Sequence, residues 1–293
     1  MSALTVSKEE EKRLKGQGFL NNRGTDEFSA RVITVNGKVT AAQHRCMAEA
    51  AEKFGNGNLT YTTRLSVEIQ GIPYEKIEEF QEFIAKEGLE TGGTGAKVRP
   101  VVSCKGTTCQ YGLLDSYAIS EEIFRRFYKG YRQVALPHKF KIAVGGCPNN
   151  CVKPNLNDVG IIGQRIPHFD SEACKVAKVV DGKLHIDEEL CRHCGRCVGK
   201  CPFHSIPDGT YGFKIYIGGR WGKKISHGKA LNRIFTSEEE ALDVIEKAIL
   251  LFKDQGLKGE RFAETIERIG FENAEKQLLE KNLLERKMEI LSK

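Results

Sequence analysis

Two kinds of chemically active side chain lie within one short stretch, residues 139–151. Lys139 and Lys141 are two residues apart, so on a strand both ammonium groups project from the same face. Cys147 and Cys151 follow on a turn that contains a proline, and this spacing lets two thiolates reach one iron cluster from a single loop. The segment therefore predicts both anion binding and metal ligation.

A second motif, residues 191–202, has the pattern C-x2-C-x2-C-x3-C-P, which is the ferredoxin run for a cubane iron–sulfur cluster. The third cysteine and the Cys-Pro ending favour iron over zinc. The last cysteine of such a run serves the other cluster in two-cluster ferredoxins. We therefore favour Cys174 as the fourth ligand beside Cys191, Cys194 and Cys197, with Cys201 as the alternative.

The remaining cysteines divide into one further set and one single residue. Cys104 and Cys109 form a C-x4-C pair that complements Cys147 and Cys151, and the two pairs are separated by a predicted helix. This arrangement predicts a second cluster site. Cys46 lies in an alanine-rich helix and is interpreted as a small buried hydrophobic residue.

Composition limits the function classes. The chain has 293 residues, 40% of them hydrophobic, and its ten cysteines suit metal binding in a reducing compartment. The net charge of +6 is spread along the chain, which argues against nucleic acid and suits small anions or an acidic protein partner. No apolar run has the length of a membrane span, and residues 1–17 read as a charged helix. We expect a cytoplasmic protein without membrane contact.

The elements before the cysteines alternate in type. Residues 28–35 and 59–69 have the pattern of strands, and residues 40–54 and 73–88 have the pattern of helices. This order predicts half of a split α+β sandwich, with helices on one face of an antiparallel sheet.

The later elements surround the cysteines. A glycine-rich loop over 91–99 is either a flexible linker or a backbone that approaches a large ligand closely. Beyond it, the sequence predicts a cysteine-dense insertion at about 170–210 and a basic glycine patch at 218–224. Four segments have helical patterns, and we expect the last to cover the edge of the core: 116–131, 237–253, 259–270 and 273–293.

Several motifs together resemble the siroheme-containing sulfite and nitrite reductases over most of residues 18–272. They are Thr62-Thr63-Arg64 before Gly71, the loop to Arg99, Pro137-His138-Lys139-Phe140-Lys141, the two cysteine pairs, and Gly259-Glu260-Arg261-Phe262. The inserted cysteine run is similar to that of the anaerobic sulfite reductases and their dissimilatory relatives. The resemblance implies an α+β fold with three parts: a ferredoxin-like half domain (1–95), a siroheme and 4Fe-4S domain (96–168 and 212–293), and an inserted 4Fe-4S ferredoxin module (169–211).

The resemblance also implies roles for individual residues. Cys104, Cys109, Cys147 and Cys151 would hold one 4Fe-4S cluster, with the Cys151 sulfur bridging to the siroheme iron. Asn149 is a candidate siroheme contact. By motif match, the cations expected around the substrate are Arg64, Arg99, Lys139 and Lys141. The carboxylates of siroheme also need cations, and the candidates, from separate stretches of the chain, are Arg31, Arg220, Lys223 and Lys224.

The implied activity is the six-electron reduction of sulfite to sulfide. Electrons from a donor protein, either ferredoxin-like or an iron–sulfur or flavin subunit, would enter at the inserted cluster and pass through the second cluster to siroheme. The alternatives are an ammonia-forming nitrite reductase and an electron-transfer subunit without siroheme.

Two departures from the family pattern bear on the site. The C-x4-C pair is one residue shorter than the C-x5-C of many relatives. The chain also holds one copy of a unit that larger members carry twice, so the resemblance implies a homodimer or higher oligomer. Each composite site would then take its cations from one subunit and its cluster from another.

Overall fold

The structure is a computed structural model that describes residues 6–169, 179–180, 183–184, 191–202 and 204–293. The chain divides into two compact units. Unit 1 comprises residues 1–102, 120–142 and 256–261, and unit 2 comprises residues 103–119, 143–255 and 262–293.

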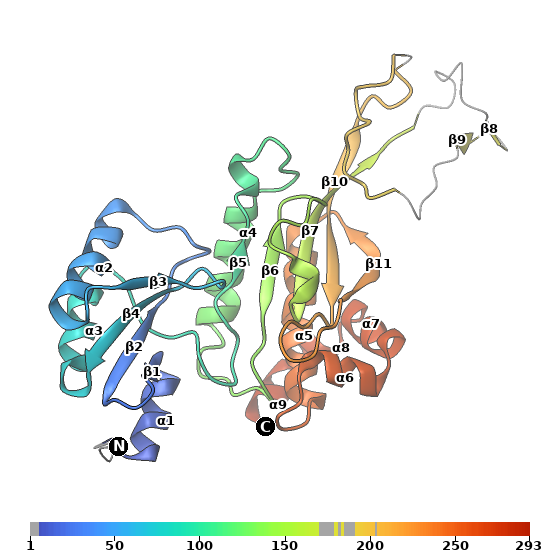
Figure 1. Cartoon of the computed structure of the whole chain (residues 1–293). Helices are drawn as coiled ribbons and strands as arrows, with labels where there is room; N and C mark the ends of the chain where they lie inside the picture. The colour runs from blue at the N-terminus through green and yellow to red at the C-terminus, as the bar shows by residue number, and fades with distance from the viewer. Residues whose placement is uncertain (1–5, 170–178, 181–182, 185–190, 203) are drawn as a thin grey trace. The chain divides into compact units, whose positions relative to one another are not determined.

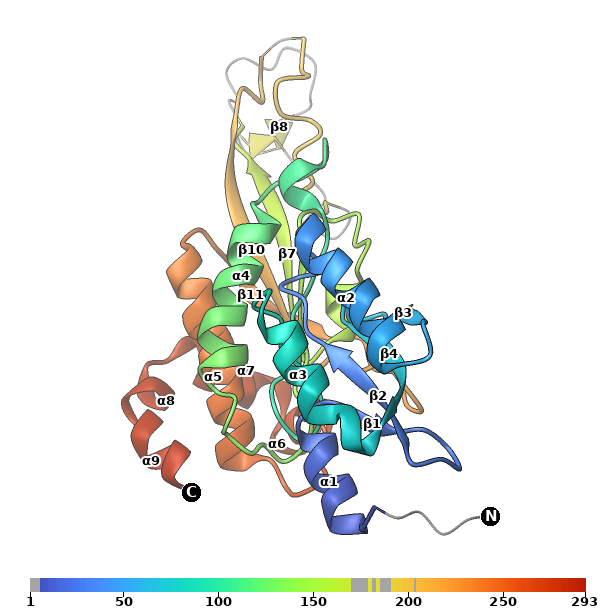
Figure 2. The same ribbon diagram turned by 90° about the vertical axis from the view of Figure 1, so that its left-hand side faces the viewer.

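Unit 1 is built on a four-stranded antiparallel sheet with the strand order β1-β2-β4-β3. Figure 2 shows α2 and α3 lying together over this sheet. Their apolar faces meet the sheet in one core, where Phe80 packs edge-on against Phe19 and Phe54 with ring centroids 6.1 and 6.0 Å apart. The elements are α1 (Lys8–Gly16), β1 (Phe19–Asn21), β2 (Glu27–Val32), α2 (Ala41–Phe54), β3 (Leu59–Tyr61), β4 (Val67–Pro73) and α3 (Ile77–Ala85).

Local sequence sets the ends of these helices. Thr40 begins α2 with a capping box, in which its hydroxyl accepts from the Gln43 backbone N–H at 3.1 Å and the Gln43 side chain accepts from the Thr40 N–H at 3.0 Å. Gly55 ends the helix, which matches the helical pattern predicted over residues 40–54. A short 3₁₀ turn, Tyr74–Lys76, leads from Pro73 into α3.

The larger sheet has five strands in the order β11-β10-β7-β6-β5. Its longest pair is antiparallel, β7 with β10, in register from Val159 opposite Ile217 to Pro167 opposite Gly209. The inserted segment leaves and returns at the paired ends of these two strands (Figure 1). The strands are β5 (Val102–Ser103), β6 (Ile142–Gly145), β7 (Val159–Pro167), β10 (Gly209–Ile217) and β11 (Lys229–Phe235), with β8 (Val179–Val180) and β9 (Lys183–Leu184) pairing separately within the insertion.

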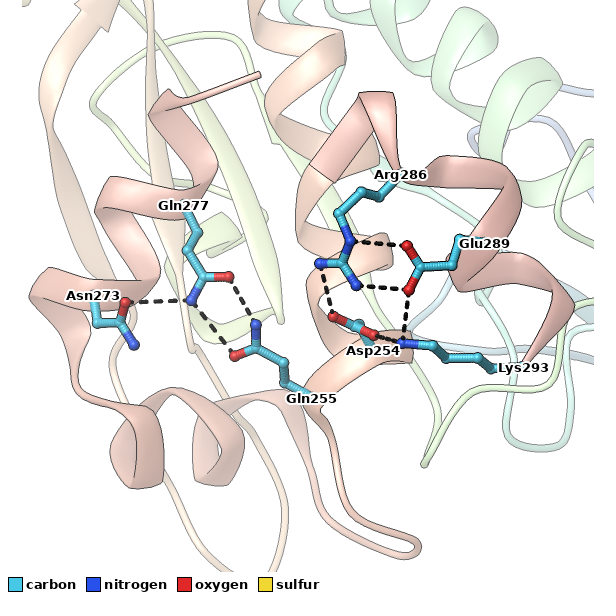
Figure 3. Close-up of polar contacts among 7 residues, drawn as sticks. All are labelled: Asp254, Gln255, Asn273, Gln277, Arg286, Glu289 and Lys293. Carbon is cyan, nitrogen blue, oxygen red and sulfur yellow. Dashed lines mark hydrogen bonds and ion pairs between the residues drawn. The ribbon is translucent and has the colours of Figure 1, made fainter. Parts of the chain in front are cut away.

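Helix α5 (Glu238–Gln255) organises the carboxyl-terminal part of unit 2. It contributes ten buried residues and packs against β10, β11 and the helices that follow. Polar side chains fix the last helices to its end: Gln255 pairs with Gln277 at 2.7 Å, and Arg286 reaches Asp254 at 3.5 Å (Figure 3). These helices are α6 (Phe262–Ile269), α7 (Phe271–Leu279), α8 (Asn282–Glu285) and α9 (Lys287–Ser292).

The predicted α+β class is confirmed, but two predicted elements are wrong in extent. The strand expected over 59–69 is a hairpin, because β3 and β4 are separated by a turn in which Leu65 has a φ of 61°. The helix expected over 273–293 is broken into the carboxyl-terminal part of α7, α8 and α9. The helix expected over 116–131 runs as α4 (Ser116–Ile123) and continues as a π-helix over Phe124–Lys129.

Candidate functional site

A cavity in unit 1 gathers all of the cations predicted from the sequence of that unit. Its volume is about 210 Å³. The lining combines five basic side chains with hydroxyl groups from the β3–β4 turn. The lining residues are Arg31, Thr62, Thr63, Arg64, Ser66, Gly93, Arg99, Pro100, Lys139 and Lys141. The roles assigned to the basic residues stay predictions, but their side chains surround a common space.

Lys139 and Lys141 reach the cavity from one extended segment. Strand β6 begins only at Ile142, so the lysines precede the strand on which they were expected. The residue between them, Phe140, is fully buried and pairs with Val98, and its carbonyl accepts from the Arg99 N–H at 2.8 Å. This pairing keeps the segment extended, so alternation still presents both lysines to the same cavity.

Backbone carbonyls hold Arg64 and Arg99, and a carboxylate holds Arg31. Arg64 donates to the carbonyl of Pro100 at 3.0 Å, and Arg99 donates to the carbonyls of Gly93 and Gly95, the latter at 3.0 Å. Arg31 forms an ion pair with Glu68, its Nε lying 2.9 Å from the carboxylate. Each guanidinium is therefore fixed in place before any ligand arrives.

Burial and like charge act together on Arg99. Burial, with the neighbouring positive charges of Arg31 and Arg261, lowers the pKa of its guanidinium to about 10. Arginine stays protonated in proteins, so the shift measures how unfavourable the positive charge is in this cavity. An anion in the cavity would relieve that cost.

The glycine-rich loop is a packed segment, which neither sequence-based alternative described. A Cβ on Gly92 would lie 2.6 Å from the Tyr128 hydroxyl, and one on Gly93 would lie 2.9 Å from Pro100. The Gly93 N–H donates to the Tyr128 hydroxyl at 3.1 Å. Gly92 and Gly93 are thus required by contacts within unit 1, and these contacts position the Gly93 carbonyl to which Arg99 donates.

Sequence reasoning missed the hydroxyl groups. Thr62 and Ser66 hydrogen-bond to each other at 2.7 Å across the β3–β4 turn and line the cavity with Thr63. Thr62 and Thr63 directly precede Arg64 in the matched motif. Their position beside a predicted anion ligand is the sequence feature that indicates hydroxyl groups in the cavity wall.

In unit 2, the four cysteines of the two separate pairs, Cys104 with Cys109 and Cys147 with Cys151, share one neighbourhood. Burial raises the pKa of the Cys147 thiol, a hydrogen bond from the Asn149 backbone opposes this, and the Cys104, Cys151 and Cys109 thiolates raise the pKa further. The two loops touch through glycine. A Cβ on Gly106 would lie 2.8 Å from the Gly146 Cα, and the Gly146 N–H donates to the Cys104 sulfur at 3.1 Å.

Four thiols are the ligand set of a cubane cluster, in which each cysteine binds a different iron. Within the described part of the chain, no three His, Cys, Asp or Glu side chains are arranged to hold one metal ion. The N–H donor to Cys104 is also the kind of hydrogen bond that tunes cluster potentials.

The inserted run brings its cysteines together in the same way. Burial raises the pKa of the Cys197 thiol, and the Cys191 and Cys194 thiolates raise it further. Cys201 lies in the described part of the chain and is half-buried. Cys174, predicted as the fourth ligand, lies outside the described residues.

The basic patch after β10 is distributed around a different cavity of about 520 Å³ in unit 2. Arg220 and Lys224 line it, and both face Glu264, at 2.7 and 3.8 Å. Lys223 is exposed. The contact of Arg220, Lys223 and Lys224 with siroheme carboxylates stays a prediction. Glu264 neutralises part of the charge of Arg220 and Lys224. Asn149 is exposed on the turn between the two cysteines of its loop.

Two family models match most of the chain. The model of the Nitrite and sulphite reductase 4Fe-4S domain matches residues 94–287, and that of the Nitrite/Sulfite reductase ferredoxin-like half domain matches residues 21–87. The chain belongs to the nitrite and sulphite reductase family. The resemblance drawn from the motifs is confirmed.

Individual relatives agree with this assignment. An uncharacterized protein of Methanocaldococcus jannaschii is 30% identical over 87% of this chain and 92% of its own length. The coenzyme F420-dependent sulfite reductase of the same organism is 29% identical over 76% of this chain and 37% of its own length. The chain thus spans about a third of that second relative.

A solved structure confirms the fold. The crystal structure of dissimilatory sulfite reductase I superimposes with a TM-score of 0.68 at 20% identity, covering 86% of this chain and 69% of the other. In the described residues, no helix combines the length and the apolar character needed to cross a bilayer.

Proposed function

We propose that the protein is a siroheme-dependent sulfite reductase. The observation that carries this proposal is the cavity of unit 1, in which Arg31, Arg64, Arg99, Lys139 and Lys141 meet around about 210 Å³. These side chains are half-buried, and a partly desolvated concentration of positive charge is costly without an anion. A small oxyanion inside it offsets that cost and accepts several charge-assisted hydrogen bonds.

The charge of the cavity favours sulfite over nitrite. Sulfite carries up to two negative charges and three oxygen atoms, whereas nitrite carries one charge and two oxygens. The four basic groups predicted around the substrate and the hydroxyls of Thr62, Thr63 and Ser66 offer more donors than nitrite can accept. The family includes enzymes for both anions, so nitrite reduction to ammonia is the second candidate.

The residues of the cavity bind the anion and supply protons. Reduction follows HSO₃⁻ + 6 e⁻ + 6 H⁺ → HS⁻ + 3 H₂O, so three oxygens leave as water. Lys139 and Lys141 are the proton donors, because an ammonium group can release a proton whereas the guanidinium groups of Arg64 and Arg99 keep theirs. The arginines orient the anion and hold its charge throughout.

The donor sets fit the cofactors. Siroheme with a coupled 4Fe-4S cluster, when bound, would supply electrons to the anion. Cys104, Cys109, Cys147 and Cys151 would hold the cluster, and basic residues suit the carboxylates of the tetrapyrrole. The inserted module, residues 169–211, would hold its own 4Fe-4S cluster, and this inserted cluster would accept electrons from a donor protein.

We also propose that two chains share each site. The basic cavity belongs to unit 1. The four cysteines expected to hold the cluster next to siroheme, Cys104, Cys109, Cys147 and Cys151, all belong to unit 2. A mixed dimer of a Lys139→Ala/Lys141→Ala chain with a Cys151→Ser chain should retain about one working site. Complete inactivity of such a dimer would count against sharing.

Absorption spectroscopy and turnover test the proposal. The purified protein should show the visible bands of siroheme, and sulfite should shift them. Rates with a reduced viologen dye should be higher with sulfite than with nitrite. A fully metallated protein without tetrapyrrole bands would refute the reductase assignment and leave an electron-transfer subunit, and a strong preference for nitrite would replace sulfite as the substrate.

A further inference from the structure

The two cysteine sites of unit 2 are joined by a side-chain contact. Arg196 lies between Cys194 and Cys197 of the inserted run, and Tyr111 lies two residues after Cys109. The Arg196 guanidinium carbon lies 5.5 Å from the centroid of the Tyr111 ring, within the range of a cation–π interaction. A residue beside a ligand of one site therefore contacts a residue beside a ligand of the other.

The backbone of the inserted run is also attached to β7. The Arg165 N–H donates to the His193 carbonyl at 2.8 Å, and Arg165 pairs with Cys194. Gly195 has a φ of 67°, and a Cβ there would lie 2.8 Å from the Arg165 side chain. This attachment anchors one edge of the run, and the Arg196–Tyr111 contact is a second anchor on a different loop.

A cavity lies beside both sites. It measures about 300 Å³, and its walls include Cys191 from the inserted run and Pro148 from the Cys147–Cys151 loop. Gln164, only 3% exposed, lines it from β7, the strand that carries Arg165. The two cysteine sites are therefore neighbours separated by a small polar space.

We propose that Arg196 and Tyr111 form a positioning pair that fixes the separation of the two clusters for electron transfer between them. This inference rests on the proposed function only in requiring a cluster at each cysteine site. In the step concerned, the reduced inserted cluster loses one electron, and the cluster bound by the Cys147–Cys151 loop gains it; no bond or proton changes place. Because electron transfer slows steeply with distance, a loose inserted run slows this step.

The chain offers a matched control for the loss of charge. Lys200 lies directly before Cys201, as Arg196 lies directly before Cys197, and it is exposed. No ring contact involves Lys200 in the described structure. Arg196→Gln and Lys200→Gln each remove one positive charge beside the inserted cluster, but only the first removes the contact with Tyr111.

The test uses the fully metallated protein without sulfite. A photochemical reductant reduces the inserted cluster, and electron paramagnetic resonance follows the arrival of the electron at the second cluster and the magnetic interaction between the two reduced clusters. Arg196→Gln and Tyr111→Leu should slow the transfer about tenfold and weaken the interaction, and the double variant should be no slower than either single variant. Lys200→Gln and Tyr111→Phe should behave like the wild type.

Unchanged transfer and magnetic interaction in both contact-removing variants would overturn the proposal, as would an equal effect of Lys200→Gln. If Arg196→Gln loses iron, Tyr111→Leu decides alone, because the Tyr111 side chain is half-exposed and its removal opens no buried cavity. The measurement needs no substrate. A protein that transfers electrons in this way but does not reduce sulfite would refute the proposed function and leave the positioning pair intact.

Discussion

The backbone N–H of Gly146 donates a hydrogen bond to the sulfur of Cys104 at 3.1 Å. This contact joins the two loops that carry the cysteine pairs, and it exists because neither loop has a side chain at the crossing point. A Cβ on Gly146 would lie 2.7 Å from the Gly106 Cα. The loops can therefore approach closely only if both residues are glycine.

Gly146→Ala should separate the loops and impair cluster binding. Forcing a methyl group into this contact should cost about 1–3 kcal/mol of unfolding free energy, and the iron and sulfide content of the site should fall with it. Chemical iron analysis and thermal unfolding would measure both effects. Gly16→Ala is the control, because no atom lies within 4 Å of the added carbon at the end of α1. Full iron content in Gly146→Ala would show that the loops tolerate separation.

The two cysteine sites should lose metal independently. Cys147→Ser should remove about four iron atoms from the site that Cys147 shares with Cys104, Cys109 and Cys151, and it should leave the inserted cluster intact. Cys194→Ser should do the reverse. Electron paramagnetic resonance of the reduced protein distinguishes the two remaining signals. If either substitution abolished both signals, the sites would depend on one another for folding.

Paired substitutions at Cys174 and Cys201 decide the fourth ligand of the inserted cluster. We expect Cys174→Ser to lower the iron content by about four atoms or to convert the cluster to a three-iron form, while Cys201→Ser retains it. The inserted cluster's resonance signal is the readout. The opposite pattern would assign the ligand to Cys201, which directly continues the run.

Spacing predicted the grouping of the cysteines better than it predicted the local fold around the cavity. It divided them into two sets, and the described members of each set lie near one another, while their role as metal ligands stays a prediction. It did not reveal the turn at 62–66, because residues 59–69 alternate throughout and contain no glycine or proline. The turn forms through local bonds: Ser66 N–H to the Thr62 hydroxyl at 3.2 Å and Thr62 N–H to the Ser66 carbonyl at 2.9 Å.

The glycine-rich loop shows the same limit. Its composition permits flexibility, ligand approach or tight packing equally, and only tertiary contacts decide among them. Tyr128, which fixes Gly93, lies 35 residues further along the chain on the π-helical segment. No local pattern at residues 91–99 could indicate that partner.

Replacing the predicted proton donors should impair turnover without loss of cofactor. Lys141→Met keeps much of the side-chain volume and removes the proton, and we expect sulfite reduction to fall about 10²- to 10⁴-fold. Siroheme absorbance should be unchanged. The control is Lys97→Met, a half-buried lysine of unit 1 that does not line the cavity. Equal losses in both variants would indicate a structural effect rather than proton delivery.

The carboxyl-terminal helix should come loose in acid because of Glu289. Arg286 holds the pKa of this carboxyl at about 2, burial opposes the shift, and Lys293 supports it (Figure 3). The folded-state pKa is thus below the ordinary value of 4.5, so the stabilising contribution is complete above pH 4.5 and is lost as the pH falls towards 2. The anchor for these charges is Asp254, whose side chain is 9% exposed and contacts both Arg286 and Lys293.

Hydrogen exchange of residues 287–292 would measure this release. At pH 7, Glu289→Gln should raise exchange in α9, and the difference from the wild type should shrink as the pH falls from 4.5 towards 2. Asp254→Asn should have a larger effect at pH 7, costing about 1–3 kcal/mol, because it leaves two cations without their buried partner. No effect of Glu289→Gln at pH 7 would show that other contacts hold α9 in place, and a difference that persisted at the acidic end would show that protonation of Glu289 does not release it.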